Sequence, residues 1–363
     1  MMSVKRPIMV MAGGTGGHVF PALAVADFLR QQGESIVWMG TRNGIESRLV
    51  PEAGIPIEWL EVQGLRGKGV LALALAPFKL IQACWQAMSI LRRNRPRAVL
   101  GMGGFAAGPG GLMAWVLRIP LIIHEQNAVI GLTNKLLKGL ARISFFAFPQ
   151  PAKGISNAVV VGNPVRADIL AIADPQTRLL GREQKKLRLL VVGGSLGART
   201  LNEVVPAAIA QLAVEQRPEI RHQCGERHLQ SCQALYQQHQ VTAEVTAFVK
   251  DMKQAYEWAD LVICRAGALT VSELAAAGMA SILVPYPYAV DDHQYLNATY
   301  LQQAGAAELL RDHELNAEHL QVLIARFSTN RDQILQMSTR ARSMAFTDAT
   351  EQVAQGILKE ALA

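Results

Sequence analysis

The chain contains one arrangement twice: a short apolar run that ends in a glycine-rich turn and leads into a helical pattern. The first copy, PIMVMAGGTGGHVFPALAVA, spans Pro7 to Ala26, and the second, RLLVVGGSLGARTLNEVV, spans Arg188 to Val205. In each copy small residues let a ligand approach the backbone, and the N–H groups of the following helix favour an anion. The repetition predicts two α/β domains that face each other, with the active site in the cleft between them.

Length and composition agree with two domains. The chain has 363 residues, and a single core seldom grows beyond roughly 250 residues. Because 50% of the residues are hydrophobic and 18% are charged, the chain can bury a core without disulfides or a structural metal. Cys84, Cys224, Cys232 and Cys264 show neither CxxC pairing nor zinc spacing, which indicates reduced thiols of a cytoplasmic protein.

Neither apolar segment with a membrane-like composition is long enough to cross a bilayer. Lys5 and Arg6 precede an apolar run that is too short for a signal peptide, so no export is expected. The stretch from Gly69 to Phe78 has about half of the roughly 20 residues that a spanning helix needs, although it could lie on a membrane.

The formal charge of +7 favours an anionic partner, which could be nucleic acid, an acidic membrane surface or a phosphorylated substrate. Only 6% of the residues are aromatic and no nucleic-acid recognition module is visible. We therefore expect no nucleic-acid binding.

Short apolar runs alternate with helical patterns, as in βαβ units of a parallel sheet. The domain boundary is expected near Gly162 to Arg166, which gives domains 1–164 and 165–341, with a C-terminal helix of about 342–363 packing back on the first domain. The predicted strands are Ile8 to Ala12, Ile36 to Met39, Ile57 to Val62, Ala98 to Met102, Leu121 to His124, Ile143 to Ala147 and Val159 to Val161, then a run from Leu187, Val245 to Val249, Leu261 to Cys264 and Ile282 to Val284.

The first domain offers three groups of candidate residues. GGTGGH, Gly13 to His18, is not a dinucleotide fingerprint because Val19 replaces the third glycine, and it serves either as a tight turn or as a ligand loop. His18 is a candidate general base or a structural histidine. A second loop, GMGGFAAGPGG from Gly101 to Gly111, is expected at the same sheet edge, as are the polar residues His124 to Asn127.

The second domain offers a possible nucleotide site. In CRAGALTVSELAAAG, Thr270 and Glu273 form either a capping box or, through the carboxylate, a contact to ribose hydroxyls. Ser195 could bond phosphates, and Arg166 is either a surface charge or a nucleotide contact.

Gln294 is either a reader of sugar hydroxyls or part of a solvated loop. Asp291 and Asp292 are adjacent rather than spaced as Asp-x-Asp, so we expect no metal. The helix dipole and backbone N–H groups would instead stabilise a leaving diphosphate.

Seven sequence blocks occur in order over residues 7 to 298: GGTGGH, GMGGFAAGPGG, HEQNAVIGLTNK, VVGNPVR, VVGGSLGAR, CRAGALTVSELAAAG and DDHQYLNA. Together they closely resemble the MurG family, the bacterial UDP-N-acetylglucosamine:lipid I N-acetylglucosaminyltransferases of peptidoglycan synthesis. The resemblance implies the GT-B fold, with two Rossmann-like domains whose parallel sheets face a central cleft. It also implies an inverting transfer without cofactor, in which the C4 hydroxyl of the muramyl sugar of lipid I attacks the donor and lipid II and UDP form.

The resemblance assigns roles to individual residues. His18 and Glu125 are the candidate bases, and Glu273 would hold the ribose. Leu196 and His293 depart from a glutamine found in some relatives, so side-chain contacts there are not expected. The substrate-binding positions carried over are Thr15, Gly16, Gly17, Asn127, Arg166, Ser195, Val249, Ala268, Leu269, Thr270, Val271, Ser272, Glu273 and Gln294.

A lipid acceptor implies a place at the cytoplasmic face of the bacterial inner membrane, as a peripheral protein, with proteins of cell-wall synthesis as partners. An apolar patch with basic neighbours is predicted to rest on the anionic leaflet; the alternative is an ordinary buried helix. The apolar residues are Leu71, Leu73, Leu75 and Phe78, and the basic ones are Arg66, Lys68, Lys79, Arg92, Arg93 and Arg95.

Three alternatives remain beside this reading. One is another GT-B-type protein, such as a UDP-sugar epimerase or a transferase with a different acceptor. Another is a non-catalytic membrane protein that senses a nucleotide sugar. A nicotinamide dehydrogenase is disfavoured by the mismatch in the first glycine loop.

Overall fold

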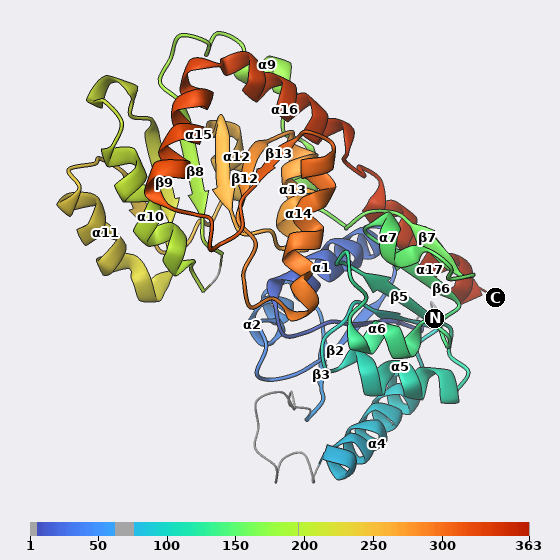
Figure 1. The fold of residues 1–363 in the computed structure, drawn as a ribbon. Helices are drawn as coiled ribbons and strands as arrows, with labels where there is room; N and C mark the ends of the chain where they lie inside the picture. The colour runs from blue at the N-terminus through green and yellow to red at the C-terminus, as the bar shows by residue number, and fades with distance from the viewer. Residues whose placement is uncertain (1–5, 62–75, 195, 363) are drawn as a thin grey trace. The chain divides into compact units, whose positions relative to one another are not determined.

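The computed structural model describes residues 6–61, 76–194 and 196–362. The chain divides into two compact units (Figure 1), one formed by Met1–Arg166 with Phe346–Ala363 and the other by Ala167–Ala345. Each unit is built around its own parallel sheet, and each is described in turn.

The first unit contains a sheet of seven strands in the order β3-β2-β1-β4-β5-β6-β7. All of its pairings are parallel. The chain leaves β1 toward β2 on one side and returns to β4 on the other, so the sheet has a switch point between β1 and β4. The strands are β1 (Ile8–Met11), β2 (Ile36–Gly40), β3 (Ile57–Trp59), β4 (Ala98–Gly101), β5 (Leu121–Glu125), β6 (Ile143–Phe146) and β7 (Ala158–Val160).

Helices cover both faces of this sheet, which explains why its central strands are apolar without alternation. Ile8 and Val10 face a core shared with α1 (Gly16–Gln31), α2 (Glu46–Glu52) and α17 (Ala349–Leu362). Met9 and Met11 face the opposite core, with α4 (Ala76–Asn94), α5 (Ala107–Val116) and α6 (Leu132–Leu137). The short helix α7 (Pro149–Ala152) precedes β7. In Figure 1 the red C-terminal helix α17 accordingly belongs with the first unit.

The second unit repeats the topology in a sheet of six strands, ordered β10-β9-β8-β11-β12-β13 and parallel throughout. The predicted α/β class with parallel sheets is confirmed. Two strands, β9 and β13, were not predicted. The strands are β8 (Arg188–Val192), β9 (Glu219–Gln223), β10 (Glu244–Thr246), β11 (Leu261–Cys264), β12 (Ala280–Leu283) and β13 (Ala307–Leu309).

The helices of the second unit pack on this sheet around a core that includes Leu189, Val191 and Phe327. They are α8 (Ala167–Leu170), α9 (Pro175–Leu179), α10 (Arg199–Ala210), α11 (Leu229–Gln238), α12 (Met252–Trp258), α13 (Ala268–Ala277), α14 (His293–Gln303), α15 (Ala317–Thr329) and α16 (Arg331–Ser343), with single 3-10 turns at Val214–Gln216, Glu226–His228 and Val290–Asp292. No helix in the described ranges combines the length and apolar character needed to span a membrane.

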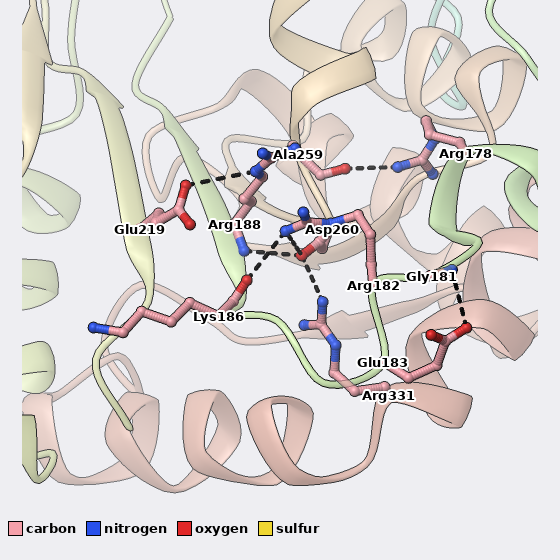
Figure 2. Close-up of polar contacts among 10 residues, drawn as sticks. All are labelled: Arg178, Gly181, Arg182, Glu183, Lys186, Arg188, Glu219, Ala259, Asp260 and Arg331. Atoms are coloured by element: carbon pink, nitrogen blue, oxygen red, sulfur yellow. Dashed lines mark hydrogen bonds and ion pairs between the residues drawn. The ribbon is translucent and has the colours of Figure 1, made fainter. Parts of the chain in front are cut away.

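Within the second unit, a buried carboxylate attaches the segment before β8 to the rest of the unit (Figure 2). Asp260, 1% exposed, precedes β11 and accepts hydrogen bonds from Arg182 Nε at 2.8 Å, Arg331 Nη2 at 2.6 Å and the Arg188 backbone N–H at 2.9 Å. Nearby, Arg178 donates to the carbonyl of Ala259 at 2.6 Å. Burial alone would raise the pKa of Asp260, but the hydrogen bonds from Arg182, Arg331 and Arg188 outweigh it and hold that pKa below its usual value.

We expect Asp260→Asn to destabilise the second unit by about 3 kcal/mol, because it leaves two buried guanidinium groups without a counter-charge. Urea unfolding at pH 7 measures this. Glu219→Gln is the control, since it removes only the more exposed pair with Arg188 at 3.5 Å and should cost less than about 1 kcal/mol.

The pH dependence gives a second readout. Since the folded pKa of Asp260 is depressed, its contribution is present above the ordinary aspartate pKa of about 3.9 and is lost as the pH falls through the folded value. Asp260→Asn should flatten that acid loss. A variant as stable as the parent at pH 7 would contradict the role of Asp260.

Candidate functional site

Two glycine loops meet at the switch point of the first sheet. Gly13 to His18 follow β1, and Gly103 and Gly104 follow β4 with φ of +94° and +84°. A Cβ on Gly104 would lie 2.5 Å from the carbonyl oxygen of Gly13, and one on Gly103 would lie 2.9 Å from Cδ2 of His18. Only glycine fits such a contact. The two loops therefore lie together at one edge, as the sequence predicted.

The first loop leads directly into α1. Thr15 is the N-cap residue, exposed and in extended conformation, and its side chain makes no capping hydrogen bond. Gly16 and Gly17 are the first two residues of the helix. His18 follows, half-buried, with its ring against Gly103. Thr15, Gly16, Gly17 and His18 thus occupy the end of α1 at which backbone N–H groups favour anionic or hydroxyl ligands.

Glu125, the last residue of β5, is a buried carboxylate that organises the loop after it. Its Oε1 accepts from the backbone N–H of Asn127 at 3.1 Å. Its Oε2 accepts from the backbone N–H of Gly131 and from Nδ2 of Asn134, both at 2.9 Å. Both carboxylate oxygens are thus engaged with donors. The arrangement fixes Asn127 at the same sheet edge as the glycine loops.

A buried histidine links this loop to the segment that ends the first unit. His124 Nε2 donates to the carbonyl of Gly162 at 2.9 Å, and its Nδ1 lies 3.2 Å from Nε2 of Gln126. Burial lowers the pKa of His124 to about 4, although the bond to Gly162 opposes this, so the ring is neutral near pH 7. Arg166 lies four residues after Gly162, and its guanidinium carbon is 6.0 Å from the centre of the Phe20 ring.

In the second unit the glycine loop after β8 is attached to the end of β9. The Gly193 N–H donates to the backbone carbonyl of Gln223 at 2.9 Å, and Gly194 has a φ of +84°. Ser195 lies outside the described residues. Val249 is half-buried in the segment after β10, which ends at Thr246, so the predicted strand to Val249 is too long.

The helix α13 presents its N-terminus at the carboxyl end of β11. Gly267 is its N-cap, so Ala268, Leu269 and Thr270 form the first turn and Val271, Ser272 and Glu273 the second. The capping-box interpretation is wrong, because Thr270 and Glu273 both lie inside the helix. The buried Glu273 carboxylate instead accepts from the Tyr256 hydroxyl at 3.3 Å.

The loop after β12 is held in an unusual backbone conformation. Asp291 and Asp292 have φ of +53° and +49°, a region that costs a non-glycine residue about 1–3 kcal/mol. The Asp292 carboxylate pairs with Arg311 Nη1 at 3.1 Å, and the Arg311 guanidinium lies 3.8 Å from the Tyr295 ring centre. Gln294 is the second residue of α14 there, and its Oε1 accepts from the Tyr286 N–H at 2.9 Å.

The predicted site residues fall into two sets, each at the carboxyl edge of its own sheet. The first set is Thr15, Gly16, Gly17, His18, Glu125, Asn127 and, at the end of the unit, Arg166; the second is Val249, Ala268, Leu269, Thr270, Val271, Ser272, Glu273 and Gln294. Within the described ranges, no group of His, Cys, Asp and Glu side chains is arranged to hold a metal ion.

Four residues that shape these loops were missed by the sequence: Glu46, Asn134, Gln223 and Arg311. Each is a single polar residue in a segment that predicts only an exposed helix, turn or strand. Their partners lie from five residues away, as Thr41 does from Glu46, to 32 residues away, as Gly14 does from Glu46, and none of these spacings is a local motif. Glu in the first turn of a helix, as at position 46, is the only signal, and it ordinarily indicates a favourable charge at a helix N-terminus.

Family models match most of the chain. Residues 8–144 match the glycosyltransferase family 28 N-terminal domain, and residues 188–353 match the glycosyltransferase family 28 C-terminal domain. The matched ranges contain the glycine loops of both units.

Individual relatives cover nearly the whole chain. A Methylococcus capsulatus protein named UDP-N-acetylglucosamine--N-acetylmuramyl-(pentapeptide) pyrophosphoryl-undecaprenol N-acetylglucosamine transferase is 54% identical over 358 residues, 99% of each chain. The crystal structure of Acinetobacter baumannii MurG superposes with a TM-score of 0.82 at 44% identity, covering 98% of this chain and 99% of that one.

A more distant structure shares the fold alone. The UDP-GlcNAc 2-epimerase of Neisseria meningitidis, solved with UDP-GlcNAc bound, has a TM-score of 0.68 at 12% identity and covers 97% of this chain and 99% of that one. The predicted GT-B type of architecture, two Rossmann-like sheets in one chain, agrees with these neighbours.

Proposed function

The chain belongs to glycosyltransferase family 28 as a member of the MurG group, and from this we propose how it transfers N-acetylglucosamine from UDP-N-acetylglucosamine to lipid I. It is a hexosyltransferase whose acceptor is N-acetylmuramyl-(pentapeptide) pyrophosphoryl-undecaprenol and whose product is lipid II. The observation that carries this conclusion is 54% identity to a transferase of that name over 99% of both chains. At such coverage the loops of both units have counterparts in the relative.

We propose a single displacement with inversion. The C4 hydroxyl oxygen of the muramyl sugar forms a bond to the anomeric carbon of the donor as the bond from that carbon to the diphosphate oxygen breaks. The electron pair of the broken bond leaves with UDP, and the hydroxyl proton passes to a base of the protein. Inversion follows because the nucleophile attacks opposite the leaving group.

The second unit is the proposed donor domain. The N-terminus of α13, Ala268 to Thr270, would stabilise the diphosphate through its backbone N–H groups and the helix dipole, with Ser195 of the glycine loop beside it. Glu273, two turns into α13, would accept hydrogen bonds from the ribose hydroxyls. Val249 would lie beside the uracil.

Gln294 and the first unit would complete the donor contacts. Gln294 would lie beside the sugar, and Asn127 would bond the N-acetylglucosamine. Thr15 to Gly17 would contact the donor, and Arg166 would reach the nucleotide. In this scheme the diphosphate needs no metal ion, since Asp292 is engaged by Arg311 and the positive end of α13 supplies the counter-charge.

His18 is the preferred base. An imidazole accepts a proton near neutral pH, and His18 sits half-buried where the two glycine loops of the first unit meet. Glu125 is the weaker candidate, because its oxygens already accept hydrogen bonds from Asn127, Gly131 and Asn134. Those bonds suit a residue that shapes the loop.

The first unit is the proposed acceptor and membrane domain. On α4 the outward side chains Phe78, Ile81 and Trp85 recur at helical spacing, and Phe78 and Trp85 are 72% and 71% exposed. The adjoining helices add Trp115 on α5 and Leu132 and Leu136 on α6, all exposed. An exposed apolar surface shared by three neighbouring helices marks an interaction site.

Basic residues accompany this surface: Lys79, Arg92, Arg93 and Arg95 near α4 are exposed. We propose that the surface rests on the anionic cytoplasmic leaflet and that the protein is a peripheral membrane protein. The exposure of Phe78 contradicts the buried-helix alternative at that position. Leu71, Leu73, Leu75, Arg66 and Lys68 lie outside the described residues.

The assay that tests the function is UDP release from UDP-N-acetylglucosamine with and without a lipid I analogue, in the presence of EDTA. We expect release that depends on the acceptor and survives chelation. Release without acceptor would favour an epimerase, and donor binding without release would favour a sensor.

Glu273→Ala should raise the donor KM about 10- to 100-fold, since it removes charged hydrogen bonds to the ribose. Tyr256→Phe keeps the carboxylate and should have a smaller effect.

His18→Ala should reduce kcat by about 10²-fold or more with an unchanged melting temperature and unchanged UDP affinity, because it removes the base but little packing. Glu125→Gln serves as the comparison. It disturbs the hydrogen bonds to Asn127, Gly131 and Asn134, so its loss of activity should come with a lower melting temperature. A near-normal kcat for His18→Ala would remove His18 from this role.

Trp85→Glu should weaken binding to phosphatidylglycerol vesicles by about tenfold or more, since burial of an aromatic side chain contributes roughly 1.5–3 kcal/mol. Its melting temperature should not change because the side chain is exposed. Vesicle binding is measured by sedimentation of the protein with the vesicles. Val322→Glu, the same type of change at an exposed position of the second unit, is the control. Equal vesicle binding by both variants would contradict the membrane assignment.

A further inference from the structure

A buried carboxylate lies beneath the first glycine loop. Glu46, the first residue of α2, is 0% exposed. Its Oε2 accepts from the backbone N–H of Gly14 at 2.9 Å, and its Oε1 accepts from Thr41 Oγ1 at 2.6 Å and the Thr41 N–H at 3.0 Å. Burial of a charge is costly unless hydrogen bonds compensate it. The carboxylate is therefore held in place by one residue of the loop and one residue after β2.

The glycines around Glu46 fit its side chain. A Cβ on Gly13 would lie 2.5 Å from Glu46 Oε1, and one on Gly40 would lie 2.9 Å from Glu46 Cγ. A Cβ on Gly44 would overlap the carboxylate. These three glycines, at the ends of β1 and β2 and in the turn before α2, leave the space that the carboxylate fills. Replacement of Glu46 thus acts directly on the backbone of the first loop.

The second unit has a neutral counterpart. Gln223, the last residue of β9, is 3% exposed. Its Oε1 accepts from the Gly194 N–H at 3.0 Å, while its Nε2 donates to the carbonyl of Gly194 at 3.0 Å and to that of Ala247 at 2.9 Å. One amide group therefore fixes both polar backbone groups of Gly194 and ties that loop to the segment after β10.

The two contacts are related by topology. In each sheet the glycine loop follows the central first strand, β1 or β8, and the side chain that holds it belongs to the next strand or to the helix after it. Gln223 ends β9, and Glu46 begins α2, the helix that follows β2. In both cases the partner is a glycine with positive φ, +90° at Gly14 and +84° at Gly194. Glycine is the residue with the most backbone freedom, so an external contact is needed to keep such a turn in one conformation.

We propose that Glu46 and Gln223 are positioning residues, which hold the two glycine loops in the conformations that the transfer requires. Neither contacts substrate in this scheme. Glu46 acts through Gly14 on the turn that leads to Thr15 and His18, and so affects the chemical step. Gln223 acts through Gly194 on the loop beside the donor diphosphate, and so affects nucleotide affinity. The proposal rests on the proposed transferase function.

Two pairs of variants separate positioning from stability. In the first pair, Glu46→Gln places an amide N–H against the hydrogen-bond donor of either Gly14 or Thr41. Its control, Thr41→Val, removes a hydrogen bond to the same carboxylate but leaves the bond to Gly14. Gln223→Met keeps the packing volume without the hydrogen bonds. Its control, Tyr236→Phe, removes a buried hydrogen bond to His222, the neighbour of Gln223 on β9, and leaves the bonds of Gln223 to Gly194 in place.

We expect the two variants to change different parameters. Glu46→Gln should lower kcat at least tenfold and leave the Kd for UDP within twofold. Gln223→Met should raise that Kd at least tenfold and leave kcat at saturating donor within threefold. The controls should lower the melting temperature comparably but change neither parameter more than threefold. Glu46→Asp, which keeps the charge on a shorter side chain, should fall between the parent and Glu46→Gln, and replaces it if that variant does not fold.

Effects that merely follow the melting temperature, or that appear in both parameters for both variants, would overturn the proposal. The test also survives failure of the transferase assignment. UDP binding needs no acceptor, and amide hydrogen exchange over residues 13–17 should accelerate in Glu46→Gln but not in Thr41→Val. An inactive parent with these two results intact would reject the proposed function alone, whereas unchanged exchange and UDP affinity would reject the positioning roles.

Discussion

Close approach of backbone to backbone at the carboxyl edge of each sheet is the constraint on which the site depends. In the first unit Gly104 packs on the carbonyl of Gly13, and in the second a Cβ on Gly225 would lie 2.7 Å from the Cα of Gly197. A side chain at these positions would separate the loops. The strand order places them side by side, because β1 pairs with β4 and β8 pairs with β9, and neighbouring parallel strands end at the same edge. The glycines are therefore a requirement of the topology as much as of any ligand.

The central strands were predictable because both of their faces are buried. A parallel strand covered on two sides is a continuous apolar run, and Ile8 to Met11 and Leu261 to Cys264 are such runs. β9 was not predictable in this way. Its residues Glu219 and Arg221 form ion pairs with Arg188 and Glu244, and the buried His222 is bonded to Tyr236 and Asn202. β13 has only three residues and carries no periodic signal.

The site was predictable where its signal is local. Glycine-rich turns after apolar strands indicated both loops, and the polar residues that end and follow β5 indicated Glu125 and Asn127. The roles of these residues depend on partners elsewhere. Glu125 was considered as a base from its position, yet its contacts with Gly131 and Asn134 are apparent only in the folded chain. Likewise the spacing of Thr270 and Glu273 fits a capping box, and only the start of α13 at Ala268 shows that both lie inside the helix.

These contacts share a physical effect: they order the loops before substrate binds, so that binding itself costs less conformational entropy. A loop free to sample many conformations loses that freedom on binding, at the expense of affinity or of transition-state stabilisation. In the loop beside Gln294 this order comes with backbone strain, since Asp291 and Asp292 both occupy the left-handed region. The ion pair of Asp292 with Arg311, and the stacking of Arg311 on Tyr295, offset that strain. The glycine loops face the opposite difficulty, because their backbone is unstrained but flexible. The buried carboxylate of Glu46 in one unit and the buried amide of Gln223 in the other supply the restraint that glycine lacks. The neutral amide holds the loop proposed to face the diphosphate, where a carboxylate would repel the negative charge of that diphosphate.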